Sequence, residues 1–116
     1  MNKKLIFTVI LFLYTALLLF GAFNFEVDAA PKTPGFDKVL HLGGFFVFSI
    51  LLLTTLSFYN VHGRSLITVV VALTIGIIIE FVQIGIPGRD FELMDIFADL
   101  VGILIGMVVV WSFSKQ

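Results

Sequence analysis

Ionisable and amide side chains gather in the second half of this chain, between two strongly apolar segments. Five of the eight acidic residues fall within Glu80–Asp99, the segment EFVQIGIPGRDFELMDIFAD. Carboxylates can bind cations or act as general acids and bases. Because ionisable groups at membrane depth are unfavourable without a partner, we expect these residues to form a polar site.

Helical spacing puts these polar residues on the same faces as small or aromatic residues that pack helices together. Three such stripes are present: Lys38, His41, Phe45 and Phe48; Gly76, Glu80 and Gln83; and Asp95, Asp99, Gly102 and Gly106. The glycines are best explained by close helix packing. The stripes predict that three helices direct their polar groups inward at one end of a bundle.

The composition requires a membrane environment for these helices. Hydrophobic residues make up 59% of the 116 residues, charged residues only 13%, and the mean hydropathy is +1.14. Soluble domains carry about 25% charged residues. The net charge of −1 implies no nucleic-acid partner. The absence of cysteine excludes disulfides, thiolate chemistry and cysteine-ligated zinc.

Four apolar runs have the length of membrane spans. They predict an all-α integral membrane protein, a four-transmembrane-helix bundle with short loops, and the helices are Leu5–Phe23, Val39–Phe58, Ser65–Ile84 and Asp95–Phe113. The first run has a signal peptide as its rival interpretation, but it is longer than the usual apolar region of one. Asp95 suits the N-cap of the last helix, which does not exclude a place in the site.

The loops favour an arrangement with both termini in the cytoplasm. That orientation places four of the seven Lys and Arg residues inside and three outside, a weak positive-inside pattern. All the acidic residues then fall in the outer half. Glu80 lies about 6 Å from the outer end of its helix, at 1.5 Å per residue. We therefore expect the polar site at the outer face.

The ordered motifs make the chain similar to the VanZ-like family, small bacterial membrane proteins named for a teicoplanin-resistance determinant. The resemblance covers about residues 37–106. It rests on Asp37-Lys38 followed by His41 and Phe45, then Glu80 with Gln83, then GRDFELMD with Arg89 and Asp95, then Gly102 and Gly106. The family usually has asparagine where this chain has Asp99. The resemblance implies one VanZ-like transmembrane domain over residues 1–116 in a bacterial cytoplasmic (inner or plasma) membrane. Some members of this family are linked to glycopeptide resistance, so the resemblance also raises that link as an expectation.

The leading hypothesis is a module that binds or handles an anionic envelope lipid or a glycopeptide-related ligand. Lys38 and Arg89 would supply cationic donors, Arg89 in bidentate fashion. His41 and Gln83 would add hydrogen bonds. The acids Glu80, Asp95 and Asp99 would orient the cations. This hypothesis requires no cofactor and no metal, and its partners are membrane lipids.

Two alternatives remain open. One is a membrane-embedded enzyme acting on a lipid-linked substrate, with His41, Glu80 and Asp95 as catalytic candidates. These residues and Asp99 would bind Mg²⁺ or Mn²⁺, or serve as general acid and base. The sequence contains no HExxH, GxSxG or cysteine motif to support it. The other alternative is a structural protein with an internal salt-bridge network.

Overall fold

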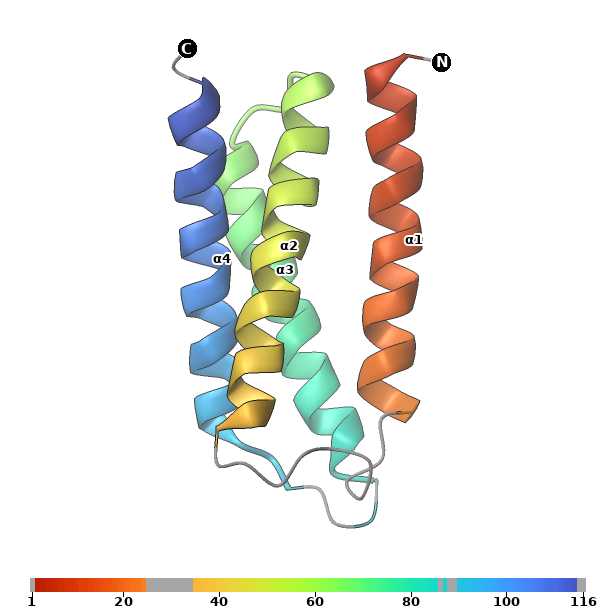
Figure 1. The fold of residues 1–116 in the computed structure, drawn as a ribbon, viewed down its shortest axis with the longest axis vertical. Helices are drawn as coiled ribbons and strands as arrows, with labels where there is room; N and C mark the ends of the chain where they lie inside the picture. Colours follow the sequence, from red (N-terminus) through yellow and green to blue (C-terminus); the bar gives the residue numbers. More distant parts are fainter. Residues whose placement is uncertain (1, 25–34, 86, 88–89, 115–116) are drawn as a thin grey trace.

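The chain folds as an up-and-down bundle of long helices (Figure 1). The computed structural model describes residues 2–24, 35–85, 87 and 90–114, without the side chains of residues 23, 24 and 37. Within these residues there are four helices and no strand: α1 (Lys3–Asn24), α2 (Phe36–Phe58), α3 (Arg64–Gln83) and α4 (Leu93–Ser114). Each helix is long and apolar enough to cross a membrane. The predicted all-α four-helix fold is confirmed.

All four helices begin one to three residues earlier than their predicted apolar runs, and two of these starts bear on the site. The helix α2 begins at Phe36, directly after Gly35, whose φ of 82° is readily adopted only by glycine. The helix α4 begins at Leu93, so Asp95 is its third residue and the N-cap interpretation of Asp95 is wrong. The Asp95 amide donates to the Glu92 carbonyl at 3.1 Å. Its carboxylate is therefore available to point into the bundle instead of capping the helix.

The closest helix pair is α2 and α4, and two glycines permit it. A Cβ atom built on Gly102 would collide with the backbone carbonyl of Leu42. A Cβ on Gly106 would lie 2.7 Å from the carbonyl oxygen of Phe46 and would also collide with Ser49. The contacts with Leu42 and Phe46 are with backbone, which cannot move aside cheaply. Gly102 and Gly106 therefore allow α2 and α4 to pack closely, as the sequence predicted.

The interior is apolar along most of the bundle and polar at one end. The buried core residues are Phe45, Phe48, Leu52, Leu53, Ala72, Ile79, Ile103 and Met107. The outward faces carry large exposed apolar side chains, such as Phe12, Leu66, Leu93 and Phe113, each about 70% exposed. Such a surface is compatible with hydrocarbon and not with water. The fold is that of a multi-pass membrane protein.

The helix α1 packs against α2 and α3. The Tyr14 hydroxyl donates to the Gly44 carbonyl at 2.7 Å, and Thr8 and Tyr59 share a hydrogen bond of 3.0 Å. The start of α1 and the end of α4 lie at the same end of the bundle (Figure 1). The opposite end is where α2 and α4 begin and α3 finishes. The polar residues predicted to form a site lie there.

Candidate functional site

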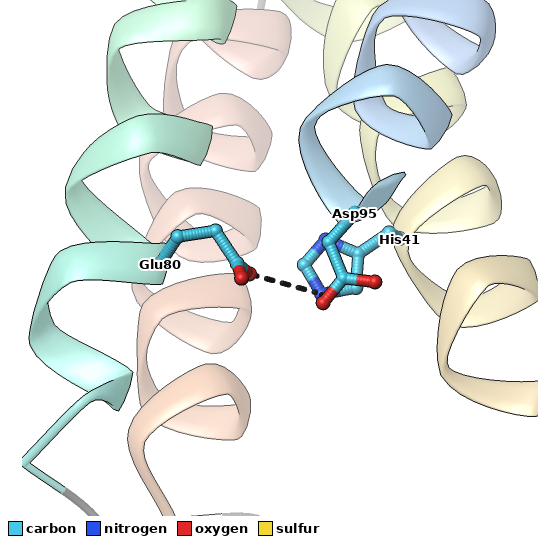
Figure 2. Close-up of side chains that lie close together, drawn as sticks. All are labelled: His41, Glu80 and Asp95. Atoms are coloured by element: carbon cyan, nitrogen blue, oxygen red, sulfur yellow. Dashed lines mark ion pairs between the residues drawn. The ribbon is translucent and has the colours of Figure 1, made fainter. Parts of the chain in front are cut away.

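Three helices each contribute a polar side chain to one point in the bundle, and two of the three, Glu80 and Asp95, are buried. His41 lies on the second turn of α2, Glu80 on the last turn of α3 and Asp95 on the first turn of α4. Their side chains point toward one another across the interior (Figure 2). The three predicted stripes therefore meet as the helical periodicity indicated. Their functional roles stay predictions.

The imidazole of His41 is held between carboxylates on both sides. Its Nδ1 lies 2.7 Å from Asp99 Oδ1, a hydrogen bond across the α2–α4 interface. An ionised Asp99 can only accept, so Nδ1 then carries a proton, and in the neutral imidazole Nε2 presents its lone pair. That Nε2 lies 3.4 Å from Asp95 Oδ2 and 3.6 Å from Glu80 Oε2. The second nitrogen is thus directed at two carboxylates from other helices.

Glu80 is completely buried, and only one of its oxygens is hydrogen-bonded among the described residues. Its Oε1 accepts a hydrogen bond of 3.0 Å from the backbone N–H of Glu92, in the segment before α4. Its Oε2 has no hydrogen-bond partner in the described part of the chain and faces His41. Glu80 was expected to orient the cationic donors Lys38 and Arg89. His41 lies beside it, and Arg89 is outside the described residues.

Lys38 lies at the rim of the site between two carboxylates. Its Nζ lies 2.5 Å from Glu92 Oε2 and 3.0 Å from Asp95 Oδ1. The contact with Asp95 is an ion pair without hydrogen-bond alignment. The Lys38 and Glu92 side chains are 31% and 46% exposed, whereas Asp95 is buried. One lysine therefore connects the surface to the buried acids.

Two of the predicted ligand-binding residues stand apart from this arrangement. Gln83 is buried one turn beyond Glu80, and its Nε2 donates to the Ala22 carbonyl of α1 at 2.7 Å. This bond ties α3 to α1. Arg89 and the side chain of Asp37 lie outside the described residues, so the structure does not place them.

The role of Glu92 and the contact between Gly76 and Asp99 are features of the site that the sequence did not predict. Glu92 uses its backbone to orient Glu80 and its carboxylate to bind Lys38. Its only sequence signal is its place one helical turn before Asp95. Gly76 makes room for Asp99, because a Cβ at this position would lie 2.5 Å from Asp99 Oδ2. Gly76 was predicted only as a packing residue on the Glu80 stripe.

The resulting group, here called the polar cluster, consists of Lys38, His41, Glu80, Glu92, Asp95 and Asp99. Four carboxyl groups face two basic groups, so the cluster has a surplus of acid. Buried carboxylates require protons, paired cations or a metal ion. The arrangement can therefore bind cations or relay protons. The rim lysine, Lys38, can also exchange its carboxylate partner for another anion.

Comparison with known protein families identifies the family of the chain. A family model described as VanZ/LLP1 matches residues 2–114. Neither a search of curated proteins nor a search of solved structures found a match. The family model covers almost the entire sequence, including every residue of the polar cluster. The chain belongs to the VanZ/LLP1 family.

Proposed function

We propose that this protein binds an anionic envelope lipid or a glycopeptide-related ligand at the polar cluster, on the outer face of a bacterial cytoplasmic membrane, with both termini in the cytoplasm. The observation that carries the proposal is the Lys38–Glu92 ion pair above a buried acidic interior. It offers an anion a cationic partner at the surface of a protein that is otherwise apolar at its sides.

Partner exchange at Lys38 is the proposed binding step. Partly exposed ion pairs are worth about 0–1 kcal/mol, so a phosphate can replace the Glu92 carboxylate with little loss. Asp95, 3.0 Å from Lys38 Nζ, keeps the ammonium at the rim during the exchange. The exposed apolar residues Leu93 and Met94 at the start of α4 lie next to Glu92 in the sequence. They provide contact for acyl chains beside the headgroup.

Native mass spectrometry of the detergent-solubilised protein with added phosphatidylglycerol or phosphatidylcholine tests this step. We expect the wild type to retain phosphatidylglycerol preferentially. Lys38→Gln should lose that preference, and Glu92→Gln should strengthen it by removing the competing carboxylate. Arg64→Gln is the matched control, because Arg64 is an exposed cation at the opposite end of the bundle. Equal retention of both lipids by the wild type, or equal effects of all three substitutions, would refute the proposal.

The link to glycopeptide resistance has its own test. In a susceptible bacterial host, expression of the wild type should raise the teicoplanin concentration needed to stop growth. The Lys38→Gln variant should do so less at equal membrane abundance, and Arg64→Gln should match the wild type. Unchanged susceptibility with the wild type would separate this chain from that phenotype.

The His41–Asp99 pair favours a second candidate function, an acid–base enzyme acting on a lipid-linked substrate. A carboxylate that orients an imidazole prepares its other nitrogen to accept a proton. Incubation with an extract of bacterial envelope lipids, followed by mass spectrometry over time, tests this candidate. A lipid consumed by the wild type but not by His41→Gln would support it. Identical lipid profiles would contradict it.

A further inference from the structure

We infer that His41, Glu80 and Asp95 together bind one divalent cation, of the class represented by Mn²⁺. One ligand atom from each residue lies within 4.8 Å of the other two, and each comes from a different helix. The side chains converge from α2, α3 and α4 (Figure 2). This inference goes beyond lipid binding, because it concerns what neutralises the buried acids.

An unsatisfied atom at the centre of the group points to a missing partner. Glu80 is 0% exposed, and its Oε2 has no hydrogen-bond partner among the described residues while facing His41 Nε2. Buried carboxylate oxygens are normally hydrogen-bonded, paired or bound to a metal. At 3.6 Å the imidazole is too distant for a hydrogen bond. A cation between Glu80 Oε2 and His41 Nε2 would satisfy both atoms.

The spacing of the three donor atoms fits a small divalent ion. Ligand atoms bound at about 2.1 Å in neighbouring octahedral positions lie about 3.0 Å apart. His41 Nε2 is 3.4 Å from Asp95 Oδ2 and 3.6 Å from Glu80 Oε2. These two distances exceed 3.0 Å by only a few tenths of an ångström, and the ligand atoms of the two carboxylates lie within 4.8 Å of each other.

Asp99 has the position of an outer-shell residue for this site. Metal-binding histidines commonly donate their other ring N–H to a carboxylate, which fixes the tautomer and aims the free nitrogen at the metal. His41 Nδ1 makes this contact with Asp99 Oδ1 at 2.7 Å. A carboxylate in this position strengthens the basicity of the imidazole.

The donor set selects the class of metal. Two carboxylates and one imidazole provide hard oxygen ligands with a single nitrogen, and the chain has no cysteine to attract softer ions. Carboxylate-rich sites suit Mg²⁺ and Mn²⁺, and the imidazole favours the transition metal of the two. Lys38 can compensate only part of the acidic surplus, so a divalent charge is electrostatically favourable at this point.

A bound cation would also supply positive charge for a headgroup phosphate beside Lys38, a consequence that rests on the proposed function. Metal binding at His41 Nε2 would occupy the lone pair needed for a general base. It would therefore exclude the acid–base form of the enzymatic alternative while leaving a metal-dependent form.

Electron paramagnetic resonance tests the inference in detergent without added lipid, so failure here leaves the lipid proposal standing. The protein is stripped with EDTA and titrated with Mn²⁺, and loss of the free-ion signal counts the bound ions. We expect one saturable ion per chain. Glu80→Gln and Asp95→Asn should weaken binding at least tenfold, and Asp99→Asn by about 10–100-fold. Asp90→Asn, an exposed carboxylate at the same end of the bundle, should leave binding unchanged.

A second measurement needs no variant that might fail to fold. The chain has two histidines, His41 in the site and the exposed His62 at the other end. In a spectrum of ¹⁵N-labelled histidine, substoichiometric Mn²⁺ should broaden the His41 signals and leave the His62 signals sharp. The inference is overturned by the absence of saturable Mn²⁺ binding or by equal broadening of both histidines. An equal loss of binding in Asp90→Asn would also overturn it, and Zn²⁺ binding without Mn²⁺ binding would overturn the metal class.

Discussion

Substituting Gly76 by alanine tests whether the position of Asp99 depends on the absence of a side chain on α3. The added Cβ would lie 2.5 Å from Asp99 Oδ2 and 3.3 Å from its Cγ. The first distance is far below van der Waals contact, so the Asp99 carboxylate must move. Because Asp99 Oδ1 holds His41 Nδ1, the imidazole must move with it.

The expected magnitude follows from two opposing effects. Overpacking a close-packed interior destabilises by about 1–3 kcal/mol. Replacing a helical glycine by alanine stabilises by about 0.5–1 kcal/mol. Gly76→Ala should therefore lower the free energy of unfolding by up to about 2.5 kcal/mol. When Asp99 is replaced by alanine, the nearest remaining atom is Phe45 Cζ at 3.5 Å, which is ordinary contact. In that background the same change should be neutral or stabilising.

The assay is denaturant unfolding in detergent of the four proteins in a double-mutant cycle. Gly43→Ala is the matched control, because nothing lies within 4 Å of a Cβ built there. A ¹⁵N-histidine spectrum should show displaced His41 signals in Gly76→Ala and unchanged His62 signals. An equal loss of stability with and without the Asp99 side chain would refute the reasoning, as would an unchanged His41 spectrum.

Three further predictions concern packing, the buried acid and topology. Gly102→Ala should lower the free energy of unfolding by about 1–3 kcal/mol, because the added Cβ would collide with the backbone of α2. A stability equal to that of Gly43→Ala would contradict this prediction. Glu80→Gln should keep the fold but retain less of the bound lipid, and Glu80→Leu should also fold if the acid serves only function. Both variants are assayed for thermal stability and for lipid retention. Full lipid binding by both would leave Glu80 without a role. Reporter fusions along the chain should place both termini inside, and the opposite pattern would reverse the orientation. The fusion sites expected outside are Thr33 and Gly88, and those expected inside are Gly63 and Gln116.

The sequence predicted that the polar side chains converge, because helical periodicity and membrane depth both indicate that Glu80 faces the interior of the bundle. A carboxylate that follows an unbroken apolar run must turn inward, and its stripe includes Gly76, which packs against α4. The same argument placed Asp99 and Gly102 on one face. These are properties of single helices, which periodicity reports directly.

Contacts between helices were not predictable in the same way. The Gln83 amide donates to Ala22 of α1, and no pattern in either helix indicates that pairing. The ion pairs of Lys38 with Glu92 and Asp95 were likewise not predicted, and the role of Lys38 as a donor to an anion stays a prediction. Glu92 precedes its helix, so no periodicity marked it. Its role depends on how the segment before α4 returns over the end of α3.

Photocrosslinking tests the central claim, that the polar cluster is a binding site for anionic lipid and not a structural salt-bridge network. A phosphatidylglycerol with a photoreactive group near its headgroup is reconstituted with the wild type, and the labelled peptides are mapped. We predict saturable labelling at the start of α4, around Leu93 and Met94, which excess unlabelled phosphatidylglycerol suppresses and Lys38→Gln abolishes. Labelling spread evenly along the apolar surface, or concentrated near Trp111 at the other end of α4, would contradict the claim.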